Sequence, residues 1–125
     1  MQRVLIIEDD RTLSDPVRAL VERLGYEVHQ AFNSDEAAVA LLGGRWGLVL
    51  SDVLVPNGAD GMEVIRAASK LMPEPRPAVV FITGMSLTDG ARRIARDMGV
   101  DVVLKPFRNA ELAALVQKKL GAPRD

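Results

Sequence analysis

The chain has 125 residues, a common size for one domain with one hydrophobic core. Its 16 basic and 17 acidic residues give a net charge of −1, which excludes the basic footprint of a direct nucleic-acid binder. The absence of cysteine excludes disulfides, thiolate zinc sites and cysteine nucleophiles. No apolar run reaches the roughly 20 residues that span a bilayer, and no signal-peptide pattern is present. We therefore expect one cytoplasmic domain over residues 1–125, with a short tail at 121–125 and no membrane partner.

The first predicted elements are a buried strand and an amphipathic helix. Residues 4–7 form an apolar, β-branched run, which is typical of a strand covered on both faces. We predict that Ser14 is the N-cap of the following helix and that Pro16 lies in its first turn. Apolar side chains then recur with helical spacing until Gly25, which ends the helix. We interpret Asp10 as a turn or cap residue.

The second strand is expected at residues 28–31. It carries His29, the single histidine, which we expect to be partly exposed. Asn33 and Glu36 have the spacing of a capping box for a helix that runs to residue 42 and stops at two glycines.

The third strand, residues 48–51, leads directly into Asp52. Trp46, just before it, is interpreted as a packing residue. A loop with Pro and Gly at 56–58 precedes a helix with apolar periodicity over residues 62–72.

The remaining chain continues the alternation of strands and helices. Strands are predicted at 78–82 and 102–104, and helices at 91–98 and 112–120. Five strands alternating with five helices predict an α/β fold, because such long crossovers favour parallel pairing with helices on both faces of the sheet.

Polar residues stand at the carboxyl ends of four of the five strands, where open parallel sheets bind ligands. The first strand ends in Glu8-Asp9-Asp10, and the others end in Asp52, Thr83 and Lys105. Carboxylates about 4 Å apart repel by several kcal/mol at an effective dielectric near 20, so packing alone does not explain this acidic group.

A cation among these carboxylates would remove the repulsion, and oxygen ligands favour Mg²⁺ or Mn²⁺. Lys105 adds a fixed positive charge, so the anion that fits both is a phosphoryl group, with Thr83 as a hydrogen-bond donor. A carboxylate at the centre of such a group can itself act as the nucleophile.

These residues resemble the CheY-like response-regulator receiver family of two-component signal transduction over nearly the whole chain. The matching segments are 5–9 (Leu-Ile-Ile-Glu-Asp), Asp52 with Pro56, 60–63 (Asp-Gly-Met-Glu), 81–84 (Phe-Ile-Thr-Gly) and 105–107 (Lys-Pro-Phe). The resemblance implies a single-domain, doubly wound (βα)5 flavodoxin-like fold with a parallel five-stranded sheet of order 2-1-3-4-5.

The resemblance also implies the roles of the acidic residues. Asp52 would accept a phosphoryl group from the phosphohistidine of a sensor histidine kinase or phosphotransfer protein, as in a phosphorelay. Asp9, Asp52 and the backbone carbonyl of Leu54 would bind Mg²⁺ directly, and Glu8 partly through water.

Thr83 and Lys105 would contact the phosphoryl group, and the Lys105–Pro106 bond would be cis. Phosphorylation would switch the face formed by residues 91–98, 102–104 and 112–120, which a downstream effector reads. The same face offers a route to a homodimer. Such a domain is a signalling module rather than an enzyme, although it assists its own phosphotransfer and autodephosphorylation.

Three features depart from the family pattern. Val102 replaces a frequent aromatic whose ring moves on activation, the loop 56–61 is one residue longer, and the segment 99–105 is one residue shorter. Leu54 and Met85 occupy the positions that tune water access, and both are apolar, which predicts slow autodephosphorylation.

The sequence argues against two other classes of protein. A haloacid-dehalogenase-type phosphatase needs a second acid at position 54, where the chain has Leu, and a flavodoxin-like cofactor binder needs a phosphate loop where the chain has acids. A docking module that works without phosphorylation stays open, favoured by Val102. Arg92, Arg93 and Arg96 are either a solvated face or a contact for an acidic partner.

Overall fold

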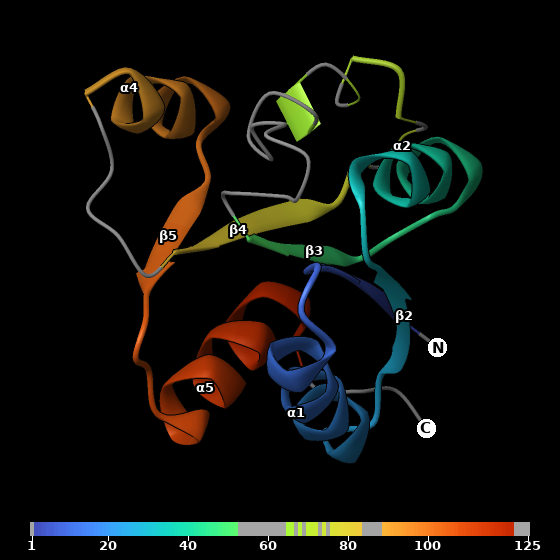
Figure 1. Ribbon diagram of the computed structural model, residues 1–125, viewed down its shortest axis with the longest axis vertical. Coiled ribbons are helices and arrows are strands. Elements are labelled where there is room, and N and C mark those ends of the chain that lie inside the picture. Colours follow the sequence, from blue (N-terminus) through green and yellow to red (C-terminus); the bar gives the residue numbers. More distant parts are fainter. Residues whose placement is uncertain are drawn as a thin grey trace.

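A computed structural model describes residues 2–52, 65–66, 68, 70–72, 74, 76–83 and 89–121 of the chain. Strands and helices alternate along these residues (Figure 1). The strands are β1 (Arg3–Ile7), β2 (Glu27–Ala31), β3 (Leu48–Asp52), β4 (Ala78–Thr83) and β5 (Asp101–Leu104). The helices are α1 (Arg11–Arg23), α2 (Ser34–Gly43), α4 (Asp89–Met98) and α5 (Asn109–Leu120).

The five strands form one parallel sheet in the order β2-β1-β3-β4-β5, which confirms the predicted fold and strand order. The order reverses direction between β1 and β3, so the carboxyl ends of these two strands meet at the switch point of the sheet. Ile7 is level with Ser51 in this pair, and Asp52 is level with Ile82 in the next. The topology therefore brings together the residues that follow β1, β3 and β4.

Alternate strand residues point to opposite faces of the sheet and form two hydrophobic cores. Leu5, Val49 and Phe81 face α2, α4 and residues 65–72, whereas Val4, Leu50 and Val80 face α1 and α5. Figure 1 shows the same division, with α1 and α5 on one side of the sheet and α2 and α4 on the other. Burial on both faces explains why the three central strands, β1, β3 and β4, are continuous apolar runs in the sequence.

Helix α1 begins one turn earlier than the sequence analysis predicts. Its N-cap is Asp10, whose Oδ1 accepts hydrogen bonds from the backbone N–H (2.9 Å) and hydroxyl (2.6 Å) of Thr12. The prediction of Ser14 as N-cap is wrong, because Ser14 is buried and its Oγ accepts a hydrogen bond from Gln30 Nε2 (2.8 Å). Pro16 consequently lies beyond the first turn. The interpretation of Asp10 as a cap is confirmed, as is the end of the helix at Gly25, which has a positive φ of 98°.

Helix α2 begins as predicted. The Oδ1 of Asn33 accepts a hydrogen bond from the N–H of Glu36 (2.8 Å), while Glu36 Oε1 accepts one from the N–H of Phe32 (3.3 Å). Trp46 is a packing residue, as expected: the residue is 7% exposed, and its indole N–H donates to the carbonyl of Ala40 in α2 (2.8 Å). His29 is exposed on β2, which is the edge strand of the sheet.

The end of α5 is tied to the start of β2. The hydroxyl of Tyr26 donates a hydrogen bond to the carbonyl of Gly121, and Tyr26 is buried. The predicted loop at 56–58 lies outside the described residues, as do residues 62–64, 67 and 69 of the predicted helix at 62–72. Three apolar residues of that helix, Ile65, Ala68 and Met72, are described and buried. Of the helices within the described ranges, none is both long and apolar enough to cross a bilayer.

Candidate functional site

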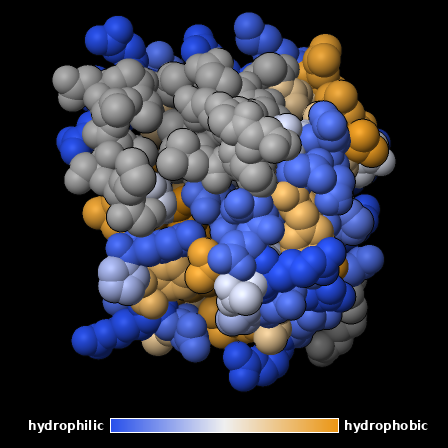
Figure 2. Space-filling model, viewed as in Figure 1, coloured by the Kyte–Doolittle hydropathy of each residue, from blue (hydrophilic) through white to orange (hydrophobic). Residues whose placement is uncertain are grey.

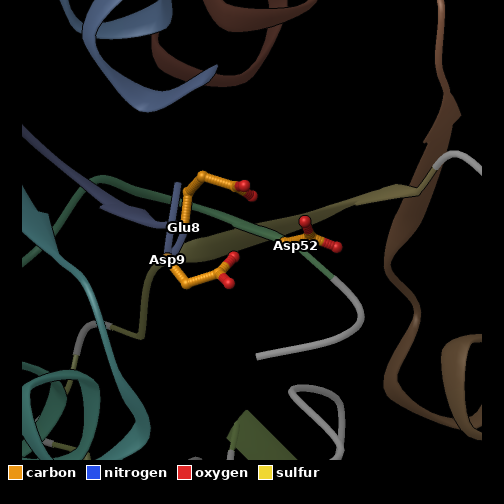
Figure 3. Close-up of side chains that lie close together, drawn as sticks. All are labelled: Glu8, Asp9 and Asp52. Carbon is orange, nitrogen blue, oxygen red and sulfur yellow. The ribbon is translucent and has the colours of Figure 1, made fainter. Parts of the chain in front are cut away.

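Three carboxylates meet at the carboxyl ends of β1 and β3 (Figure 3). Glu8 and Asp9 directly follow β1, and Asp52 is the last residue of β3, the strand that pairs with β1. One oxygen of each carboxylate lies within 4.8 Å of the others, which is the spacing that a shared cation needs. The pairing of β1 with β3 thus brings these three side chains to one point.

The three acids differ in their exposure to solvent. Glu8 is buried, with 7% of its surface exposed, whereas Asp52 is half-buried and Asp9 is exposed. The group is thus open on the side of Asp9 and closed on the side of Glu8. Asp10, the fourth acid nearby, is occupied as the cap of α1.

Lys105 supplies the positive charge at this site. Its Nζ lies 3.4 Å from Asp52 Oδ2 and 3.9 Å from Glu8 Oε2. The lysine directly follows β5, and its backbone N–H donates to the carbonyl of Thr83 (2.7 Å), so β4 and the site lysine are linked. The Lys105–Pro106 peptide bond is cis, as expected.

Burial raises the pKa of the Glu8 carboxyl from 4.5 to about 8, with a hydrogen bond and charge repulsion from Asp52 adding to the effect. The ammonium of Lys105 acts in the opposite direction and lowers this pKa. The raised pKa means that burial, and then the neighbouring Asp52, disfavour the ionised form of Glu8.

Thr83, another predicted site residue, ends β4 and is buried. It follows Ile82, which is level with Asp52, so it stands beside the site on the neighbouring strand. Ser51 was not singled out from the sequence: its buried hydroxyl donates to the carbonyl of Asp52 (2.9 Å) and helps to fix the backbone there. The sequence signal for Ser51 is a hydroxyl residue near the end of an otherwise apolar strand.

Several predictions on the site fall on residues outside the described ranges. These are the metal-binding carbonyl of Leu54, the water-access position Met85 and the longer loop at 56–61. Val102, which departs from the family pattern, is half-buried in β5 and packs against the core on the α2 and α4 side.

The donor set fits a hard divalent cation. Glu8, Asp9 and Asp52 offer carboxylate oxygens only, and such ligands suit Mg²⁺ or Mn²⁺ rather than zinc or copper. A small cavity of about 30 Å³ lies beside the acids, lined by Glu8, Asp52 and Lys105 together with apolar side chains. Another hollow, about 440 Å³, lies at the opposite end of β4, and none of these residues lines it.

Comparisons with known proteins agree with this geometry. The family model of the response regulator receiver domain matches residues 4–117. The transcriptional regulatory protein DltR of Streptococcus agalactiae is 31% identical over 119 residues, which cover 92% of this chain and 50% of DltR. The chain therefore spans about half the length of this relative.

Two similar solved structures extend the comparison. A CheY-like receiver domain protein of Methanospirillum hungatei has a TM-score of 0.86 at 26% identity, covering 96% of this chain and 94% of that one. The response regulator TrrA of Thermotoga maritima, solved with Mg²⁺ and BeF, has a TM-score of 0.78 at 26% identity, covering 96% of this chain and all of that one (100%). Because the family model covers most of the chain, the protein belongs to the response regulator receiver domains of two-component systems.

Proposed function

We propose that the chain accepts a phosphoryl group on Asp52 from a phosphohistidine, in a reaction that depends on Mg²⁺. The observation that carries the proposal is the convergence of three carboxylates and one ammonium at the switch point of the sheet, with Lys105 Nζ 3.4 Å from Asp52 Oδ2. A lone strand-end aspartate is usually a cap, but this aspartate has acids on one side and a cation on the other.

Asp52 is the proposed nucleophile because it lies between Lys105 and the acids of β1 and is half-buried. One of its oxygens attacks phosphorus, the P–N bond of the phosphohistidine breaks, and the imidazole leaves with the electron pair and takes up a proton. The product is an acyl phosphate.

Glu8, Asp9 and Asp52 would hold Mg²⁺, joined by the carbonyl of Leu54 as the family resemblance implies. When bound, the ion supplies positive charge that offsets the acids and the phosphoryl oxygens. Lys105 would pair with a phosphoryl oxygen from the opposite side, and the Thr83 hydroxyl would donate a hydrogen bond to another.

The proposed donors are a sensor histidine kinase or a phosphotransfer protein, and the proposed reader is a downstream effector. The switched surface would be the α4–β5–α5 face, since β5 leads into Lys105 and Lys105 is bonded to Thr83. We assign the whole chain, 1–125 with a tail at 121–125, to the receiver unit, and we place it in the cytoplasm with its proposed kinase.

We further propose that the domain promotes its own dephosphorylation only slowly. Leu54 and Met85 have no polar atom in their side chains other than a thioether sulfur, so neither can orient an attacking water by hydrogen bonding. When the phosphorylated protein is followed by intact mass at room temperature, its half-life should be longer than seconds. A half-life of seconds would contradict this.

The first experiment is intact mass after incubation with acetyl phosphate and Mg²⁺. We expect the gain of one phosphoryl group in the wild type, and no gain in Asp52→Asn or in the presence of a chelator. Asp15→Asn, an exposed change on α1, is the matched control and should behave as the wild type. A gain of equal size in Asp52→Asn would rule out Asp52 as the acceptor.

A second candidate function is a docking module that works without phosphorylation. Val102 favours it, because a half-buried valine has no ring that can move between two positions. If acetyl phosphate gives no gain and beryllofluoride does not bind, this candidate replaces the first. Equal affinity for an effector with and without phosphate would support it as well.

A further inference from the structure

The outer face of α2 is apolar where a surface helix is normally polar. Its solvent-facing stripe consists of Asp35, Val39 and Leu42, at i, i+4 and i+7. Val39 is 73% exposed and Leu42 46% exposed. Leu71, which precedes Met72 in a segment that shares a core cluster with α2, is 72% exposed. Figure 2 shows hydrophobic surface, in orange, at the position that α2 occupies in Figure 1. Single exposed apolar residues are common, but a stripe with neighbours is a candidate contact surface.

Opposite charges stand at the two ends of this stripe. Asp35 lies in the first turn of α2, and Arg45 follows the helix by two residues. Both side chains are exposed, and within the described part of the chain neither has an ion-pair or hydrogen-bond partner. By contrast, α1 contains an ion pair between exposed charges one turn apart, Arg18 and Glu22 (3.0 Å).

We propose that α2 packs antiparallel against α2 of a second copy of this chain. The pattern is self-complementary, as a two-fold symmetric interface requires. The point midway between positions 35 and 45 falls next to Val39, so a two-fold axis there brings Asp35 opposite Arg45 of the second copy. The same axis brings Leu42 close to Ala38 of the second copy, whose small side chain leaves room for it.

The surface beside α2 has space for the side chains of the second copy. Two open hollows of about 420 and 240 Å³ lie between α2 and the edge strand β2, and both are lined by His29, Val39 and Ala40. An apolar side chain that enters them leaves water, which favours association. A stable complex buries about 1,200 Å², whereas this stripe presents two apolar side chains, so the dimer should be weak and depend on concentration.

Sedimentation velocity of the full chain, from about 10 µM to about 1 mM, tests the proposal, since a small interface gives affinities in this range. We expect self-association in the wild type and a loss of at least about tenfold in affinity for Val39→Glu. Arg96→Glu, an exposed change on α4, is the matched control and should leave the association unchanged. A wild type that stays monomeric, or a Val39→Glu variant that associates like the wild type, would overturn the proposal.

A charge swap supplies the second test. Asp35→Lys alone brings like charges together at both ends of the interface and should weaken association about threefold or more, and Arg45→Glu should do the same. The double variant restores opposite charges and should recover the wild-type affinity. Failure of this rescue would exclude the antiparallel arrangement.

The proposal is independent of the phosphoryl chemistry, because α2 contributes no residue to the acidic site. We therefore expect the same association with and without Mg²⁺ and beryllofluoride. Association that appears only with beryllofluoride and is lost in Arg96→Glu would assign the dimer to the α4–β5–α5 face instead.

Discussion

The ammonium of Lys105 lies closer to Asp52 Oδ2, at 3.4 Å, than to Glu8 Oε2, at 3.9 Å. One ammonium thus lies near two carboxylates, Glu8 after β1 and Asp52 at the end of β3. It is closer to Asp52, the carboxylate that we propose as the nucleophile. Lys105 therefore competes with an added cation for the same negative charge, while both cations would stabilise a transferred phosphoryl group.

Lys105→Met should separate these two effects. Removing a positive charge next to the acids should raise the affinity for Mg²⁺ on the order of tenfold, while phosphorylation by acetyl phosphate should slow about 10²-fold. Titration calorimetry measures the affinity for Mg²⁺, and the time course of intact mass measures the rate of phosphorylation. Lys118→Met, an exposed change on α5, is the control; weaker binding of Mg²⁺ by Lys105→Met would contradict the electrostatic account.

Glu8 should make the stability of the metal-free protein depend on pH. Because the folded state raises its pKa from 4.5 to about 8, the folded state binds more protons than the unfolded state between these values, and its stability falls as pH rises through them. In urea unfolding with a chelator present, the wild type should lose stability between about pH 5 and pH 8 relative to Glu8→Gln. Parallel curves for the two proteins would show that Glu8 is already ionised.

Asn33→Ala should destabilise the protein by about 1 kcal/mol, since it removes the acceptor for the N–H of Glu36 at the start of α2. Asn33→Ser and Asn33→Asp keep an acceptor and should retain most of the stability. Urea unfolding of the three variants gives the comparison. Equal losses for all three would mean that packing, rather than the cap, sets the cost.

Tyr26→Phe should cost about 1 kcal/mol of stability, because it removes a hydrogen bond to the Gly121 carbonyl and leaves the aromatic packing in place. The loss should be local, so amide hydrogen exchange should accelerate most in the last turn of α5. Unchanged exchange in that turn would show that the bond does not hold the end of the helix.

The sequence was sufficient for the elements whose signals are local. Continuous apolar runs identified β1, β3 and β4, and Asn33 with Glu36 identified the start of α2. The sequence did not show whether Asp10 or Ser14 is the N-cap of α1, because both residue types cap helices. The decision depends on Gln30, a residue of β2 whose amide bonds the Ser14 hydroxyl and fixes it inside the helix. This hydrogen bond between α1 and β2 is a tertiary contact, and local sequence patterns do not predict such contacts.

The same limit applies to the site and to α2. The acids, Thr83 and Lys105 follow strands in the sequence, but the distances between them depend on the strand order, which came from the family resemblance rather than from periodicity. In α2 the buried Leu41 and the exposed Leu42 are adjacent and chemically identical. Only the position of the sheet below the helix tells which of the two packs into the core.

The single tryptophan of the chain provides an optical probe of one end of the molecule. Trp46 precedes the start of β3, whereas Asp52 stands at the other end of that strand, about 15–20 Å away. Its indole N–H is bonded to Ala40 of α2, and the guanidinium of Arg3 lies 4.3 Å from its ring centre. Its fluorescence should therefore change on unfolding and when contacts at α2 change, but not when a metal binds at the acidic site. The two ends of the domain can then be followed separately in one sample.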